Sequence, residues 1–292
     1  MKRKYLSGIS ITLIFAMLLL VSGCGVRING KEYEFFSASE KDEASVLDGI
    51  AEEASDGFTS SVDRQDAGKV AVSASSGNIK IKRSDTSQLK IEANKRVKGA
   101  SRKDKDAVLK NMDITVERNG KTIEIVVKTK NRSDFWDWLK DNYKAFQVSI
   151  DFEILLPDGI NTIEVDTGAG NIDINDISAE LLISSGAGNI DIRNVNASGQ
   201  SELEVGAGNI SFDGNVNDIK SFEASSGAGN IDFKVPGSTR MSLEANTGVG
   251  ILSGAFIKEN SDDKFSFDED INGGGPKVEL SSGVGNVSAD KK

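Results

Sequence analysis

The sequence contains no histidine and a single cysteine in 292 residues. Without histidine there is no Ser-His-Asp triad, no histidine general base and little scope for a zinc site. The cysteine, Cys24, directly follows an N-terminal apolar run, so the rest of the chain has neither disulfides nor thiol nucleophiles. Proline is also scarce, with three residues against 30 glycines. This composition favours tight glycine turns.

Basic residues are outnumbered by acidic ones, and the formal net charge is −10. Residues 1–23 hold three of the Lys and Arg and no acid, so the remainder has 32 basic against 45 acidic side chains, a net −13. We therefore expect no nucleic-acid partner. The same charge disfavours adsorption to anionic lipid and suits a solvated domain outside the cell.

The N-terminus has the organisation of an export signal. Lys2-Arg3-Lys4 precede an apolar run, Ile11 to Val21, that is too short to span a bilayer stably. Two small residues then lead to Cys24, as in the lipobox of bacterial lipoproteins. We interpret residues 1–23 as a signal peptide and Cys24 as a lipidated N-terminus, with acyl chains such as palmitate as the membrane anchor. An ordinary signal peptide with a chance cysteine is the alternative.

This interpretation places the protein on the extracytoplasmic face of a bacterial cell membrane, inner or outer. Residues 24–66 are rich in charged and small side chains, and we predict a solvated tether there. Residues 67–292 are predicted to form one folded domain.

A repeat of about 20 residues dominates that domain. The tetrapeptide Gly-Ala-Gly-Asn recurs, and its second glycine advances by 18, 20, 21 and 21 residues from one copy to the next. Weaker copies lie at residues 248–252 and 283–287, and a lone precursor lies at residues 75–81. The candidate repeat-turn residues are Gly168, Gly170, Asn171, Gly186, Gly188, Asn189, Gly206, Gly208, Asn209, Gly227, Gly229 and Asn230.

Apolar residues alternate with polar ones on both sides of each turn, so every unit supplies two short strands with one buried face. Residues 172, 190, 210 and 231 are all isoleucine and are expected to line up inside a shared core. Glycine is needed where the corner has positive φ or where coils approach closely, and asparagine tolerates the left-handed region best of the rest. We predict an all-β fold, a single-stranded β-solenoid with a small mixed N-terminal and capping region.

Three segments depart from the repeat. Residues 101–111 are expected to form a short helix before a hairpin across Asn119-Gly120. Residues 134–146 form an aromatic insert that holds both tryptophans. It is interpreted as a helix that caps the open end of the stack, or otherwise as a sugar or membrane contact. Residues 254–276 are predicted to be a loop or hairpin that projects from the stack.

Three features together resemble the bacterial putative-adhesin domain family of unknown function, over about residues 67–289. They are the lipobox, the entry strand that ends in Ile154-Leu155-Leu156-Pro157, and the repeated Gly-x-Gly-Asn-Ile-Asp units. The resemblance implies a β-solenoid-like fold, an envelope location and no catalysis. Some members are linked to envelope-stress signalling. No family site residues follow from it.

Two columns of equivalent side chains, one of aspartate and one of asparagine, are candidate sites. Asp173, Asp191 and Asp232 occupy equivalent positions, but isoleucine stands where calcium-binding nonapeptides place aspartate. We therefore favour a solvated acidic face and predict no metal or cofactor. The asparagines, Asn286 included, could hydrogen-bond along the stack as an amide ladder.

The expected function is non-catalytic: an envelope-anchored, adhesin-like surface that binds a protein or a glycan. An accessory role in envelope-stress sensing is the main alternative. A polysaccharide-active β-helix enzyme is the second alternative, although the repeat spreads the acidic residues and does not gather them into a pair.

Overall fold

The computed structural model describes residues 26–28, 31–33, 53–99, 101–143, 146–257 and 264–292. The predicted signal peptide and Cys24 lie outside the described residues. The chain divides into two units at Leu47 and Asp48. The described part of the first unit is an antiparallel pair, β1 (Val26–Ile28) and β2 (Lys31–Tyr33). Within the described residues, no helix has both the length and the apolar character needed to cross a membrane.

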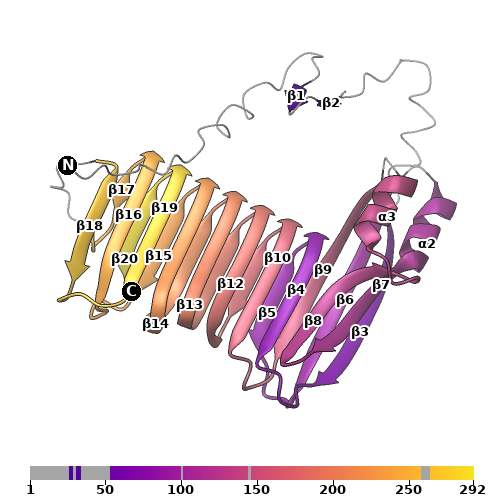
Figure 1. Ribbon diagram of the computed structural model, residues 1–292, viewed down its shortest axis with the longest axis horizontal. Helices are drawn as coiled ribbons and strands as arrows, with labels where there is room; N and C mark the ends of the chain where they lie inside the picture. Colours follow the sequence, from indigo (N-terminus) through magenta and orange to yellow (C-terminus); the bar gives the residue numbers. More distant parts are fainter. Residues whose placement is uncertain (1–25, 29–30, 34–52, 100, 144–145, 258–263) are drawn as a thin grey trace, which may run out of the picture. The chain divides into compact units, whose positions relative to one another are not determined.

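The second unit is all-β, as predicted, and its repeat strands stack in parallel (Figure 1). In each coil the strand before the glycine corner joins one ladder and the strand after it joins a second ladder. The first ladder contains β4 (Lys69–Ser76), β10 (Thr162–Ala169), β12 (Ser178–Ala187), β19 (Lys277–Val284) and β16 (Met241–Val249). The second contains β5 (Ile79–Arg83), β11 (Ile172–Asn175), β15 (Ile231–Val235), β20 (Val287–Lys291) and β17 (Leu252–Ser253). The long strands β13 (Ile190–Ala207) and β14 (Ile210–Ala228) take part in both ladders.

The alignment of the repeats is confirmed residue by residue. Ile172 pairs with Ile190, Ile190 with Ile210, and Ile210 with Ile231. All four side chains are at most 1 % exposed. Burial of an isoleucine stabilises a fold by roughly 1.5–3 kcal/mol, so this column is a main contributor to the core.

The prediction of a single-stranded solenoid is confirmed only in its all-β class. Eighteen described strands are connected by hydrogen bonds into one nearly closed, barrel-like sheet. Spatial order also departs from chain order. The precursor coil β4–β5 lies directly against β10–β11, although about 80 residues separate them in the sequence. The last repeat, β19–β20, lies between β14–β15 and β16–β17.

The N-terminal part of the second unit is a mixed sheet. It contains β3 (Ala54–Asp63), β6 (Gln88–Lys98), β7 (Met112–Asn119), β8 (Thr122–Thr129) and β9 (Gln147–Leu156). Strand β6 lies between β3 and β9 and is antiparallel to both, whereas β9 and β8 are parallel to β5 and β4. Residues 54–63 were predicted to be tether, but alternate side chains of β3 face the core, so they form an edge strand.

Two helices pack on this part of the sheet (Figure 1). The helix α2 (Arg102–Asn111) contacts β3, β6 and β7, and it matches the predicted helix at 101–111. The helix α3 (Phe135–Asn142) contacts β8 and buries Phe135 and Leu139. The aromatic insert therefore forms a helix that packs on the core.

The prediction of a projecting loop at 254–276 is wrong for the residues that the structure describes. Phe256, Ile257 and Phe267 are buried, at 4–8 % exposure. Strand β18 (Ser266–Ile271) pairs antiparallel with β16. The insertion therefore packs against the last coil and adds an antiparallel strand at its edge.

Candidate functional site

At the corners, the second glycines have the predicted positive φ, but the asparagines do not have the left-handed conformation that the sequence suggested. The second glycines, Gly170, Gly188, Gly208 and Gly229, have φ between 131° and 157°. A Cβ built on Gly208 would lie 1.9 Å from the carbonyl oxygen of Gly188, so the close approach of coils requires glycine as well. The first glycines lack positive φ and are crowded to a lesser degree; Gly206 would place a Cβ 2.6 Å from the Gly186 oxygen. The corner asparagines do not adopt the left-handed region.

The corner asparagines form the predicted amide ladder. Each Asn accepts, through Oδ1, the backbone N–H of the equivalent residue in the next coil, at 2.8–3.1 Å. The ladder begins at Asp151, whose Oδ1 accepts from the backbone N–H of Asn78 at 2.9 Å. It ends at Ile251, whose N–H donates to Asn286 Oδ1 at 3.0 Å and whose side chain offers no acceptor. The repeat-turn residues are therefore structural.

The aspartate column is partly neutralised. Arg193 forms ion pairs with Asp191 and, at 3.9 Å, with Asp173. Ser211 separates Asp191 from Asp232 in the column, and the column ends where Ser288 pairs with Asp232. Within the described ranges, no group of three or more His, Cys, Asp and Glu side chains could hold a metal ion.

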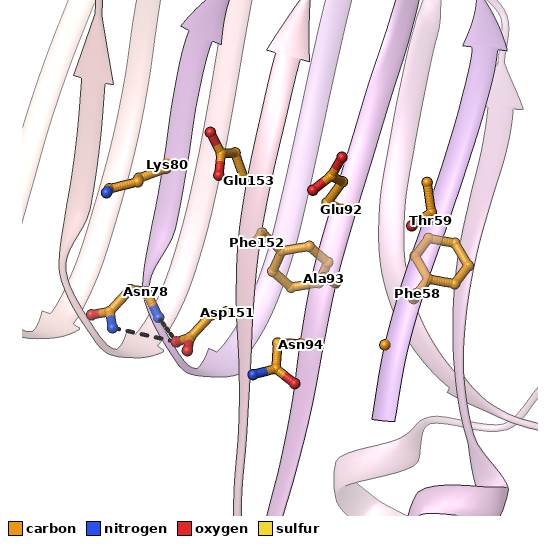
Figure 2. A pocket seen from close by; sticks show the side chains of 11 residues that line it. Phe58, Thr59, Asn78, Lys80, Glu92, Ala93, Asn94, Asp151, Phe152 and Glu153 are labelled. Carbon is orange, nitrogen blue, oxygen red and sulfur yellow. Dashed lines mark hydrogen bonds between the residues drawn. The ribbon is translucent and has the colours of Figure 1, made fainter. Parts of the chain in front are cut away.

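Two hollows lie next to each other along the outer face of the paired strands β6 and β9, and we call them together the β6–β9 groove. The first, the polar hollow, has a volume of about 510 Å³. Figure 2 shows its side chains in two rows. The outward-facing groups come from four adjacent strands: Thr59 with Gly57 from β3, Glu92 and Asn94 from β6, Asp151 and Glu153 from β9, and Asn78 and Lys80 from β5 and its preceding turn.

The second hollow, the aromatic hollow, continues along the same two strands and has a volume of about 520 Å³. Arg96, Lys98, Ser149 and Gln147 occupy the next outward positions of β6 and β9. Trp136 and Phe146 of the aromatic insert form its wall, together with Leu139 and Glu53. From residue 92 to residue 98 the groove extends about 20 Å, at ~3.4 Å per residue.

The Asp151 side chain links the two hollows to the repeat. Its Oδ2 accepts from Arg96 Nη2 at 2.6 Å, while its Oδ1 receives the Asn78 N–H that begins the ladder. The ion pair with Arg96 and the hydrogen bond from the Asn78 N–H hold this carboxylate in place. The groove and the ladder thus share one residue.

Glu92 and Glu153 face each other across the β6–β9 pair, a juxtaposition that glycosidases use when one carboxyl is a general acid. A general acid needs a raised pKa. The pKa of Glu153 is instead lowered, because its carboxylate accepts a hydrogen bond from Lys82 Nζ at 2.8 Å and lies near that charge. Glu153 is therefore poorly suited to donate a proton.

Sequence reasoning missed the groove. Its lining comes from residues 53–59, 76–98 and 136–153. Ser76, Asn78 and Lys80 belong to the precursor repeat at 75–81, Trp136, Leu139 and Phe146 belong to the aromatic insert, and the other lining residues carry no repeat signal. The period-2 pattern of β6 and β9 predicted the outward face of each strand. The antiparallel pairing that joins those faces has no signature in the sequence.

No family model matches the sequence, and neither does any curated protein. Several solved structures are similar to this chain. A putative cell adhesion protein from Clostridium sporogenes has a TM-score of 0.45 at 16 % identity, covering 82 % of this chain and 100 % of that one. A putative adhesin from Bacteroides fragilis has a TM-score of 0.38 at 15 % identity, covering 81 % and 97 %. A putative lipid binding protein from Parabacteroides distasonis has a TM-score of 0.31 at 12 % identity, covering 81 % and 96 %. Two of these names agree with the resemblance identified in the sequence.

Proposed function

We propose that this protein is a non-catalytic, adhesin-like lipoprotein of the bacterial cell surface that binds an extended glycan in the β6–β9 groove. The observation that carries the proposal is the groove itself. Two adjoining hollows follow one strand pair over about 20 Å, a shape that fits a linear chain better than a compact ligand.

The groups that line the groove match the surface of a sugar. Carboxylates accept hydrogen bonds from hydroxyls, whereas the amides of Asn78 and Asn94 both donate and accept. The rings of Trp136 and Phe146 offer apolar faces for the apolar faces of sugar rings.

The repeat supports a separate mechanical role in this proposal. We take the stacked coils to be a β-solenoid rod, in which neighbouring coils contact only each other and stiffness comes from continuous ladders. With Cys24 lipidated and anchored, the groove belongs to the part of the domain that follows the anchor most closely in the sequence, and the rod extends from that part. Parallel, in-register pairing of the coils and the unbroken asparagine ladder favour this arrangement.

The test is glycan binding by the full chain in detergent micelles, first on a glycan array and then by titration calorimetry. Gly57 is exposed, and a Cβ built there meets nothing within 4 Å. Gly57→Tyr should therefore fill the polar hollow without disturbing the core. We expect an affinity loss of at least about tenfold, equivalent to ~1.4 kcal/mol.

Ser73→Tyr is the matched control, because Ser73 is an exposed residue of β4 outside both hollows. Both variants should keep the wild-type melting temperature. Equal glycan affinity of the two variants, or no glycan bound by the wild-type chain, would refute the proposal.

A further inference from the structure

Among the described residues that line the aromatic hollow, two side chains are cationic and one is a carboxylate. Arg96 and Lys98 are neighbouring outward residues of β6, and Glu53 is the carboxylate. Lys98 Nζ lies 3.5 Å from Glu53, a long contact between half-exposed groups that contributes little stability. Arg96 Nη2 is held by Asp151, but its Nε is buried without a partner among the described residues.

The aromatic wall of this hollow is held in a fixed position. The Trp136 ring meets the buried ring of Phe135 edge to face, with centroids 5.2 Å apart and an interplanar angle of 80°. Phe146 meets Tyr143 at 5.1 Å and 70°. Tyr143 in turn contacts Trp138 at 5.4 Å. Rings fixed by such contacts lose little side-chain entropy when a ligand binds.

The polar hollow has the opposite charge. Its lining carries the carboxylates of Glu92, Asp151 and Glu153 against the single ammonium of Lys80. An anionic group is repelled at that end of the groove and attracted about 20 Å away, at the Lys98 end. The formal charge of the described lining residues therefore changes sign along the groove, and the Arg96–Asp151 and Lys82–Glu153 ion pairs offset part of this difference. The charge that is left favours one orientation for an asymmetric ligand.

We propose that the aromatic hollow binds an acidic sugar unit of the glycan. Its carboxylate or phosphate lies between Arg96 and Lys98, and its ring packs against Trp136. Neutral units of the same chain then occupy the polar hollow. This inference rests on the proposed function, since it names the class of glycan that the groove takes.

Titration calorimetry with the full chain in micelles tests the inference. The probes are hexagalacturonate as a carboxylate glycan, a phosphodiester-linked mannose oligomer as a phosphate glycan, a neutral galactose hexamer, and phosphatidylglycerol vesicles as a lipid source of phosphate. We expect Lys98→Ala to weaken binding of at least one acidic polymer by about tenfold, as for a lost charged hydrogen bond, and to leave the neutral hexamer unaffected.

Lys90→Ala is the matched control. Lys90 is an exposed, outward residue of the same strand, but it lies outside both hollows. It should change the affinity by less than about twofold, as for an exposed surface charge. Trp136→Phe, which keeps an apolar ring, should weaken all sugars to a similar, smaller degree. Binding of the acidic polymers should also fall as salt is raised, unlike that of the neutral hexamer.

Each alternative outcome separates the two proposals. If the neutral hexamer binds as tightly as both acidic polymers, the acidic-sugar inference is wrong and the glycan-binding function stands. If no glycan binds, the proposed function itself fails. Binding to the vesicles that depends on Lys98, without binding of either acidic polymer, would assign the site to a lipid headgroup and would overturn the inference.

Discussion

Replacing one corner glycine tests the physical basis of the coil stack. In Gly208→Ala the new Cβ would lie 1.9 Å from the Gly188 oxygen, whereas a weak C–H···O contact needs about 3.3–3.6 Å. The two corners must therefore separate by more than 1 Å. Two interstrand hydrogen bonds flank this point, Gly188 N–H to Ala207 O at 3.0 Å and Ile190 N–H to Asn209 O at 2.9 Å.

The expected cost follows from these two effects. Weakening both hydrogen bonds costs roughly 2 kcal/mol, and a Cβ at a φ of 150° adds roughly 1–2 kcal/mol. A total of about 3–4 kcal/mol corresponds to a fall in melting temperature of about 6–16 °C for a domain of this size. Thermal unfolding followed by circular dichroism measures it.

Two further glycines separate crowding from backbone strain. Gly120 has a φ of 60° but open space around a built Cβ, so Gly120→Ala carries the strain alone, about 1–2 kcal/mol. Gly206→Ala carries the crowding alone, since its Cβ would lie 2.6 Å from the Gly186 oxygen without a positive φ. If Gly208→Ala costs no more than Gly120→Ala, close approach of the coils does not determine the need for glycine, and the reasoning is refuted.

Three other measurements address the ladder, the charges and the order of the coils. Asn209→Ala removes the acceptor of the Asn230 N–H and should lower the free energy of unfolding in urea by about 1 kcal/mol. Asn209→Asp keeps an Oδ1 acceptor and should lower it by less. Equal losses of unfolding free energy in the two variants would count against the ladder. The pKa of Glu223 is raised by partial desolvation and by the facing carboxylates of Glu279 and Glu202, so its ionisation destabilises the fold as pH rises through that pKa. Glu223→Gln should raise the melting temperature by up to about 3 °C at pH 7 and give no gain below about pH 4, and a gain at pH 3 would contradict this cause. Deleting residues 277–292 removes β19–β20, through which β16 and β17 pair with the earlier coils. Hydrogen exchange should then show lost protection in β16, β17 and β18, while β10–β13 stay protected. Retained protection of β16 and β17 would show that their coil can stack directly on β14–β15.

The amino-acid pattern alone determined the interior of each coil and the chemistry of its corner. The isoleucine column, the positive φ of the second glycines and the asparagine ladder all follow from residues close to one another in the chain. One long-range feature was also present in the sequence: Ile251 replaces the ladder asparagine. Because its side chain cannot accept an N–H from a further coil, the unit that contains it must be the last in the ladder.

Tertiary structure decided the order of the coils and created the groove. Coils with the same apolar pattern and the same corner can pair with any other coil, so their local sequence does not choose a neighbour. The segments at the two ends of the stack and the connections between coils determine which coils are neighbours. Strand β18 pairs at one end, and β3, β6 and β9 extend the sheet at the other. The β6–β9 groove exists because antiparallel pairing places residues 92–98 opposite 147–153, and the side chains that line it acquire a common surface only when that pairing forms.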